Sequence, residues 1–256
     1  MLKRFIRQRL PSNYHEQTYE SPYWFVRIPH QMRFRTARDA VLSRAPTSLL
    51  DYGAGDGKLI LDLIDAGLTT ENVVAYEPSE GVQSDLRATL EARGLSGRVR
   101  VVGDRTALDV ESFDFIACLN VLEHMPLPER QSFYCVCDNT LQRDGSIFID
   151  VPVEIGPTLL IKNATRVLLK GRTREYDGST LLRLAAGAKM YDPSRFDPTD
   201  TRTFINKHRG FDYRLFREEL SYRFEIVDEL RSPFPGLPAW LGNQEVYFHA
   251  TRRVTS

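Results

Sequence analysis

Cysteine is scarce in this sequence, and its placement does not suggest a metal site. Three cysteines occur among 256 residues, at Cys118, Cys135 and Cys137. Cys135 and Cys137 are separated by a single residue, which is not a zinc-ligand spacing, and no fourth ligand lies near them in the sequence. We therefore expect reduced and mostly buried thiols, as in a cytosolic protein.

Long apolar runs and an excess of charge are also missing. No stretch approaches the roughly 18 apolar residues of a membrane-spanning helix, and the first residues lack the pattern of a signal peptide. The 34 basic residues balance the 34 acidic ones, so the net charge gives no support for a nucleic-acid-binding protein. With 42% hydrophobic and 27% charged residues, the composition is that of a globular protein rather than a disordered one.

What the sequence does contain is a regular alternation of strand and helix patterns. This alternation predicts βαβ units and a mainly parallel sheet. The last two predicted strands are joined by a Pro- and Gly-rich connection without a helix signal, so they should be antiparallel neighbours. The predicted strands are residues 48–52, 73–77, 99–103, 113–119, 146–151, 224–230 and 245–252, and the main predicted helices are residues 30–44, 59–66, 81–93 and 128–141.

The same patterns divide the chain into four parts. Residues 1–45 are an aromatic-rich lead-in, predicted irregular up to residue 29 and helical after it, and residues 46–154 form the ligand-binding core. Residues 155–211 are a long insertion with helical segments, and connections of this length usually serve function. Residues 212–256 complete the sheet.

A glycine-rich loop follows the first predicted strand, in the run Asp-Tyr-Gly-Ala-Gly-Asp-Gly at residues 51–57. Glycines between a strand and a helix let a ligand approach the backbone and the helix N-terminus. A dinucleotide-binding loop would place its third glycine at position 58, which is Lys58 here. Asp51 would repel a pyrophosphate and suits a ligand with an ammonium group instead. A strand-to-helix turn without a ligand is the alternative.

Acidic residues also follow the next two strands. Glu77 is placed to accept the two hydroxyls of a ribose, as acidic residues do in Rossmann sites. Asp104 is placed to accept from an adenine amino group, with the backbone N–H of Arg105 or Thr106 facing the ring. The alternatives are a surface acid at a strand end for Glu77 and a turn aspartate for Asp104.

Together these motifs resemble the class I S-adenosylmethionine-dependent methyltransferases, most nearly the type 11/12 small-molecule group. The resemblance spans about residues 46–152 and rests on Leu-Asp-Tyr-Gly-Ala-Gly-Asp-Gly, Tyr-Glu-Pro, Gly-Asp and Phe-Asp-Phe-Ile-Ala-Cys-Leu-Asn-Val-Leu-Glu-His in that order. It implies S-adenosyl-L-methionine as cofactor and a Rossmann-like α/β fold, with a seven-stranded sheet of order 3-2-1-4-5-7-6 whose strand 7 is antiparallel. The cofactor-binding residues implied by it, with their immediate neighbours, are Asp51, Gly53, Ala54, Gly55, Glu77, Pro78, Asp104, Arg105, Asn120 and Val121.

Upstream aromatic residues close over the cofactor in this family. Tyr14, Tyr19 and Trp24 are the candidates here, because a sulfonium cation is attracted to an aromatic face. The alternative is that these side chains only pack residues 1–45 onto the core.

Methyl transfer is an in-line displacement that mainly requires alignment and exclusion of water. A base is needed only if the acceptor must lose a proton. Three catalytic candidates follow: His208 after the insertion, His124 just past the fourth strand and Glu154 after the fifth. No metal site is expected, since the adjacent Glu123 and His124 make a poor chelate by themselves.

The acceptor is indicated only indirectly. Residues 1–10 and 159–174 are basic and amphipathic, which favours a phosphate-bearing or lipid-linked acceptor or peripheral membrane contact, with solvated helix faces as the alternative. The pattern from His208 to Pro235 is similar to methyltransferases found alongside polysaccharide biosynthesis enzymes, which favours O-methylation of a small molecule or glycan.

Other readings of the sequence stay open. They are N-methylation of a small molecule, an inactive cofactor-binding partner module and a nicotinamide-dependent oxidoreductase, the last disfavoured by the glycine spacing. A nucleic-acid methyltransferase is disfavoured by the balanced charge and by Asn120-Val-Leu-Glu standing where an Asn/Asp-Pro-Pro-aromatic motif would be expected.

Overall fold

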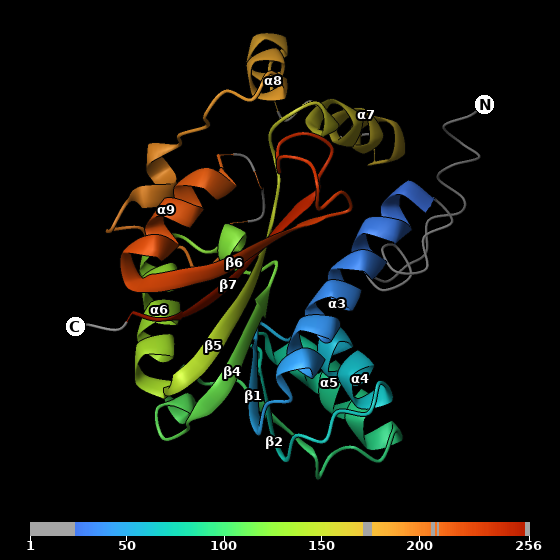
Figure 1. Cartoon of the computed structure of the whole chain (residues 1–256), viewed down its shortest axis with the longest axis vertical. Helices are drawn as coiled ribbons and strands as arrows, with labels where there is room; N and C mark the ends of the chain where they lie inside the picture. The colour runs from blue at the N-terminus through green and yellow to red at the C-terminus, as the bar shows by residue number, and fades with distance from the viewer. Residues whose placement is uncertain (1–23, 171–175, 206–207, 209, 254–256) are drawn as a thin grey trace.

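The protein is organised around a seven-stranded sheet of order β3-β2-β1-β4-β5-β7-β6 (Figure 1). The computed structural model describes residues 24–170, 176–205, 208 and 210–253, and of residues 24–30, 165, 166 and 168–170 the backbone alone. Strands β1 to β5 pair in parallel, whereas β7 is antiparallel to both β5 and β6. The predicted order and the antiparallel last strand are confirmed. The strands are β1 Ser48–Tyr52, β2 Asn72–Tyr76, β3 Val99–Val102, β4 Phe113–Leu119, β5 Leu141–Pro152, β6 Phe224–Ser232 and β7 Glu245–Arg252.

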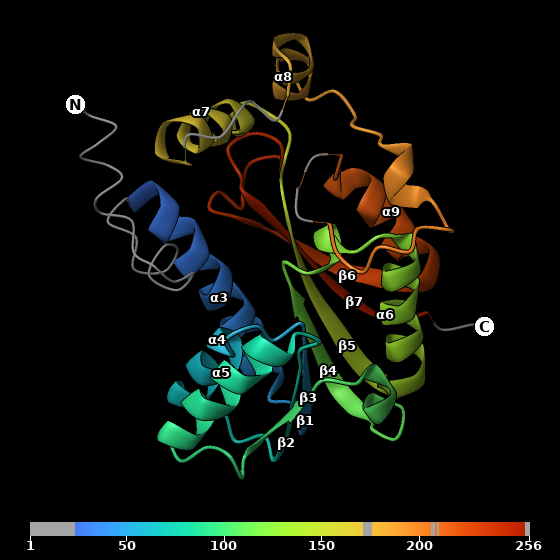
Figure 2. The same ribbon diagram turned by 180° about the vertical axis from the view of Figure 1, so that it is seen from behind.

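Helices cover both faces of this sheet. Helices α3, α4 and α5 lie on one face and α6 and α9 on the other, while α7 and α8 lie beyond one end of the sheet (Figures 1 and 2). The helices are α3 Trp24–Arg44, α4 Lys58–Asp65, α5 Glu80–Ala92, α6 Leu127–Thr140, α7 Thr158–Lys170, α8 Gly178–Ala185 and α9 Tyr213–Arg223, with short 3-10 turns η1 Arg105–Leu108, η2 Leu122–His124 and η3 Pro193–Phe196.

Two apolar cores follow from the alternation of side chains along the strands. Leu49 faces a core shared with α3, α4 and α5, whereas Leu50, its neighbour in β1, faces the core shared with α6 and α9. Because the strands are covered on both faces, they consist of nearly continuous apolar runs. Burial of apolar side chains on both faces therefore stabilises the sheet and its position between the two layers of helices.

The N-terminal helix is longer than the sequence indicated. Residues up to 29 were predicted to be irregular, but α3 begins at Trp24 and contains Pro29, so that prediction was wrong for residues 24–29. A proline near a helix N-terminus removes a single backbone hydrogen bond. The fully buried Ala37 and Val41 lie one turn apart and anchor the helix on the core. The basic amphipathic residues 1–10, Tyr14 and Tyr19 lie outside the described residues, as does the side chain of Trp24.

The insertion between β5 and β6 is helical, as predicted, and contains α7, α8 and η3. One of its basic residues points inward: Lys162 donates to the Val153 carbonyl at 2.9 Å and lies 3.5 Å from Glu154. This lysine therefore serves the protein interior rather than an external anion. Among the described helices, none combines the length and apolar character needed to cross a bilayer.

The connection between β6 and β7 packs tightly on the start of the insertion at Gly156. Gly156 has φ +84°, and a Cβ placed there would lie 1.7 Å from the Trp240 carbonyl oxygen. Only glycine combines this left-handed backbone with such close backbone contact. Gly156 thus fixes the path of the chain as it leaves β5.

Replacing Gly156 with alanine tests this contact. We expect Gly156→Ala to lower the free energy of unfolding by about 3 kcal/mol or more, because it adds steric overlap to the strain of a left-handed alanine. Gly67→Ala is the matched control, since Gly67 has φ +91° but open space around its Cβ position. It should cost about 1 kcal/mol. Urea unfolding measures both, and equal losses would contradict the packing argument.

Candidate functional site

The candidate site lies at the carboxyl edge of the sheet, between β1 and β4. The strand order reverses there, and open α/β sheets bind ligands at such a switch point. Two adjoining cavities of about 710 and 1280 Å³ flank the glycine loop. Both are lined by Gly53, Gly55, Asn120 and Val121, so the glycine loop and the end of β4 form the floor that the two cavities share.

Gly53 brings these two segments into contact. It has φ +81°, and a Cβ at this position would lie 2.4 Å from Cγ2 of Val121. The N–H groups of Gly53 and Ala54 both donate to the Tyr76 carbonyl, at 2.8 and 2.9 Å. The loop is therefore tied to the end of β2 while its first glycine packs against the segment after β4.

Asp51 is a buried acid in the smaller cavity. It is 3% exposed, and burial raises its pKa to about 7, with smaller contributions from Asp56 and Glu77. The three largest influences on this carboxyl group all oppose its ionisation. A cationic ligand would supply the missing positive charge, as the sequence argument required.

Glu77 follows β2 and is already held in place by the backbone. Its two carboxylate oxygens accept from Gly55 N–H at 3.1 Å and Ser79 N–H at 2.9 Å. It lines the larger cavity together with Pro78. Backbone N–H groups of the glycine loop and of Ser79 thus position the Glu77 carboxylate.

Asp104 and Arg105 line the same cavity. Asp104 accepts from Thr106 N–H at 2.9 Å, and this hydrogen bond lowers the pKa of Asp104. The Thr106 N–H therefore caps η1 instead of facing a ligand ring. Arg105 pairs with Glu129 at 3.0 Å. With these two, all ten residues predicted to bind the cofactor line one or the other of the two cavities.

Asn120 turns the chain sharply at the end of β4. It adopts φ +53°, a left-handed conformation that asparagine tolerates better than most residues. Its N–H donates to the Asp150 carbonyl at 3.1 Å, and its Nδ2 donates to the Asp150 carboxylate at 2.5 Å. Two bonds to one residue of β5 hold the turn.

Behind this turn lies a buried charge cluster that the sequence reading missed. Arg33 of α3 lies 3.0 Å from the Asp150 carboxylate and also pairs with Glu245. Burial and the neighbouring Glu245 raise the pKa of Asp150, and Arg33 opposes that rise. Asp150 could have been noticed as a charge inside Ile-Phe-Ile-Asp-Val, but nothing local marks Arg33 as its partner.

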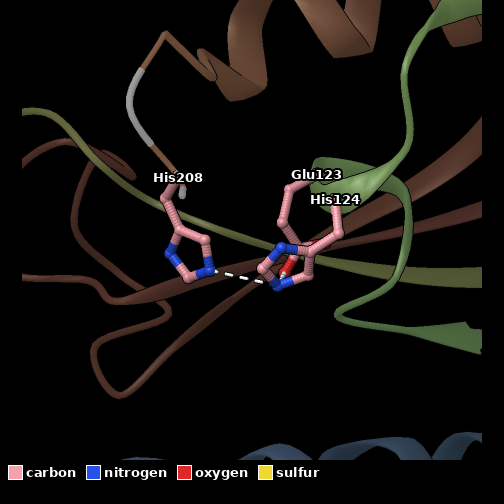
Figure 3. Close-up of side chains that lie close together, drawn as sticks. All are labelled: Glu123, His124 and His208. Atoms are coloured by element: carbon pink, nitrogen blue, oxygen red, sulfur yellow. Dashed lines mark hydrogen bonds and ion pairs between the residues drawn. The ribbon is translucent and has the colours of Figure 1, made fainter. Parts of the chain in front are cut away.

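The three predicted catalytic residues, which come from separate parts of the chain, are brought together. His208 Nδ1 lies 3.2 Å from Glu154 Oε1, and His208 Nε2 lies 3.3 Å from His124 Nε2 (Figure 3). His124 Nδ1 lies 2.8 Å from the Ile205 carbonyl, and its ring stacks on Phe204. Because His124 and Phe204 also line the larger cavity, this cluster borders the space beside the glycine loop.

Glu123 is a further member of this cluster. It is fully buried, and neither of its carboxylate oxygens has a hydrogen-bond partner among the described residues. Its Oε1 lies 3.7 Å from His124 Nε2. Burial raises the pKa of Glu123 to about 7 and lowers that of His124 to about 4. The expectation of no metal weighed only the adjacent pair, whereas the fold adds His208 as a third group.

Comparison with known proteins agrees with this fold and loop. Residues 49–145 match a family model described as a methyltransferase domain. The ubiquinone biosynthesis O-methyltransferase of Actinobacillus pleuropneumoniae serotype 5b is 35% identical over 107 residues, which are 39% of this chain and 43% of that protein. The match thus spans less than half the length of this curated relative.

Solved structures share the architecture over nearly the whole chain. A S-adenosylmethionine-dependent methyltransferase from Clostridium acetobutylicum has a TM-score of 0.57 at 10% identity, covering 93% of this chain and 96% of that one. The magnesium protoporphyrin IX methyltransferase from Synechocystis PCC 6803 with bound SAH has a TM-score of 0.52 at 14% identity, covering 98% and 93%. At sequence identities of 10% and 14%, this structural similarity establishes a shared fold and nothing further.

The sheet order and the glycine-loop cleft define a class I S-adenosylmethionine-dependent methyltransferase fold. Residues 49–145 match the model of a methyltransferase domain, which agrees with this fold. The cofactor of that class is S-adenosyl-L-methionine.

Removing Arg33 tests the buried charge cluster behind the site. We expect Arg33→Met to lower the free energy of unfolding by about 3–5 kcal/mol, because Asp150 and Glu245 lose this guanidinium. The loss should be smaller at pH 5.5 than at pH 8. Burial and Glu245 raise the pKa of Asp150, so at pH 5.5 this carboxyl group can be protonated in the folded variant and no longer needs the guanidinium.

The double variant Arg33→Met/Glu245→Gln is the control for this charge argument. Removing one of the two acids should recover part of the lost stability. Urea titrations at both pH values measure the effect, and simple additivity of the two substitutions would count against a shared ion cluster.

Proposed function

We propose that this protein transfers the methyl group of S-adenosyl-L-methionine to a hydroxyl oxygen of a small-molecule or glycan acceptor. The observation that carries the proposal is the meeting of two environments at Asn120 and Val121. On one side is the acid-lined glycine loop, and on the other the cluster of His124, His208 and Glu154.

On the donor side, each acid matches one part of the cofactor. Asp51 neutralises the amino group of the methionine moiety, which compensates the burial of its carboxylate. Glu77 accepts the ribose hydroxyls, for which its hydrogen bond from Gly55 orients it. Asp104 accepts from the adenine amino group at the far end of the larger cavity.

On the acceptor side, the reaction is a displacement at the methyl carbon. The acceptor oxygen forms a bond to carbon as the carbon–sulfur bond breaks, and the hydroxyl proton leaves. Alignment and exclusion of water provide most of the acceleration. The groups His124, His208 and Glu154 lie where they would position the acceptor oxygen and assist the loss of its proton.

The acceptor class is supported by a named relative and by a sequence pattern. The matched relative from Actinobacillus pleuropneumoniae is named an O-methyltransferase, and the pattern after His208 is similar to methyltransferases found alongside polysaccharide biosynthesis enzymes. We assign residues 155–211 to acceptor recognition, because Thr203 and Phe204 line the larger cavity, and residues 1–45 to the cover of the site. A cytoplasmic location, with contact to a membrane surface through the basic stretches, belongs to the same proposal.

Calorimetry and a transfer assay test this function. The chain should bind S-adenosyl-L-methionine and transfer radiolabelled methyl groups to a component of cell extracts or of fractionated glycans. Base-stable label would indicate an ether rather than an ester. Binding without transfer to any fraction would favour an inactive partner module, and binding of NAD in place of S-adenosyl-L-methionine would overturn the assignment.

The raised pKa of Asp51 predicts a pH-dependent affinity for the cofactor. Below about pH 7 the buried carboxyl group is protonated in the free protein and must lose that proton to pair with a cation. The Kd for S-adenosyl-L-methionine should therefore rise as pH falls from 7.5 to 5.5, by at most about tenfold per pH unit.

Asp51→Asn is the matched variant for this measurement. At pH 8 it should weaken cofactor binding by about 1.5–3 kcal/mol, the cost of losing a charged partner, and its Kd should change much less with pH. Titration of the free cofactor's own amino group affects the Kd of both proteins equally, so it does not alter the difference between them. The Tm of the free variant at pH 8 should be no lower than that of the wild type, because a buried charge has been removed.

A further inference from the structure

Three side chains that can bind a metal ion, those of Glu123, His124 and His208, converge on one point. They come from two segments, η2 and the end of the insertion (Figure 3). One donor atom from each lies within 4.8 Å of those of the other two. The tautomer of each ring decides which nitrogen presents a lone pair to the space between them.

Hydrogen bonds on the far side of each ring fix its tautomer. The Ile205 carbonyl 2.8 Å from His124 Nδ1 can only accept, so Nδ1 carries the hydrogen. The Glu154 carboxylate 3.2 Å from His208 Nδ1 imposes the same arrangement on the second ring. In the neutral rings, both Nε2 atoms therefore present lone pairs to each other, at 3.3 Å.

Two facing lone pairs repel unless a positive species lies between them. A shared proton would join the two rings but would leave the buried oxygens of Glu123 without a partner among the described residues. A divalent cation would satisfy all three groups at once. Two nitrogens bound at about 2.0–2.1 Å to a tetrahedral ion are about 3.3 Å apart, which matches the observed separation of the two rings.

The surroundings are those of a metal site as well. Histidines that bind metals usually donate their other N–H to a carbonyl or a carboxylate, and the two rings here have one of each. Phe204 stacks on His124 and restrains its rotation. Two imidazoles and one carboxylate form a donor set for borderline ions such as Zn²⁺, Co²⁺ or Mn²⁺.

We propose that Glu123, His124 and His208 bind one divalent transition-metal ion, which coordinates the acceptor oxygen during methyl transfer. Three protein ligands leave a coordination position open, and His124 faces the larger cavity beside Asn120 and Val121. A hydroxyl bound there becomes more acidic. Its proton passes to solvent, its oxygen attacks the methyl carbon, and the carbon–sulfur bond breaks to release S-adenosylhomocysteine.

The role in methyl transfer rests on the proposed function, whereas metal binding can be measured without turnover. The full chain, stripped with EDTA and desalted, is titrated with Zn²⁺ by calorimetry and with Co²⁺ by visible absorption. We expect one saturable site. Glu123→Gln, His124→Gln and His208→Gln should each weaken it at least about 100-fold, and Glu154→Gln, which alters a positioning residue, by about 10–100-fold.

His249→Gln is the matched control, because His249 is a half-buried histidine of β7 whose ring contacts Arg44 rather than the cluster. It should bind Zn²⁺ as the wild type does. Far-UV circular dichroism and Tm identify any variant that fails to fold. An absence of saturable binding, or equal affinity in the cluster variants and in His249→Gln, would overturn the metal site.

The link to transfer is tested with the assay described under the proposed function. EDTA should abolish methyl transfer and Zn²⁺ or Mn²⁺ should restore it, while calorimetric binding of S-adenosyl-L-methionine stays within about twofold. Transfer that is unaffected by EDTA would overturn the role in acceptor binding. Failure to bind S-adenosyl-L-methionine would overturn the proposed function but would leave the metal titrations interpretable, so the two failures are distinguishable.

Discussion

The turn at Asn120 is the constraint on which the rest of the site depends. Two hydrogen bonds to Asp150 hold Asn120 in a left-handed conformation. That conformation turns the chain at the end of β4, so that Val121 packs against Gly53 on one side and η2 carries Glu123 and His124 toward the other. The glycine loop and the histidine cluster are thus fixed relative to each other by one short segment, and the in-line displacement that we propose would tolerate little misalignment between them.

Charge is distributed unevenly around this turn. Behind it, Arg33 compensates the buried Asp150 and Glu245. In front of it, Asp51 has acidic neighbours, and burial raises its pKa to about 7. Buried charges of both signs therefore surround the turn on the side of Arg33. No positive charge is among the main influences on Asp51. A sulfonium cofactor with an amino group would supply that charge, whereas a dinucleotide would add negative charge.

Much of the cofactor half was predictable because its signals are local. Gly53, Asp51 and Glu77 stand at fixed distances from the ends of apolar strands, and the parallel order of those strands places them at one edge. The start of α3 was misjudged: the predicted helix began after Pro29, whereas α3 contains this proline. Lys162 was expected to face an anion but turns inward to Glu154, since a helix pattern does not reveal its neighbours.

The sequence by itself determined the alternation of strands and helices and the glycine loop, because these depend on the period of apolar residues and on glycine spacing. The sheet order came from the resemblance to a known family of methyltransferases. Only the tertiary structure decided that His208 and Glu154 meet His124, and that Glu123 lies buried beneath them. These residues are 54 and 84 positions apart in the two pairs that involve His208. No local pattern encodes such contacts; they exist because the insertion returns over the carboxyl edge of the sheet, where packing rather than spacing fixes which side chains face one another.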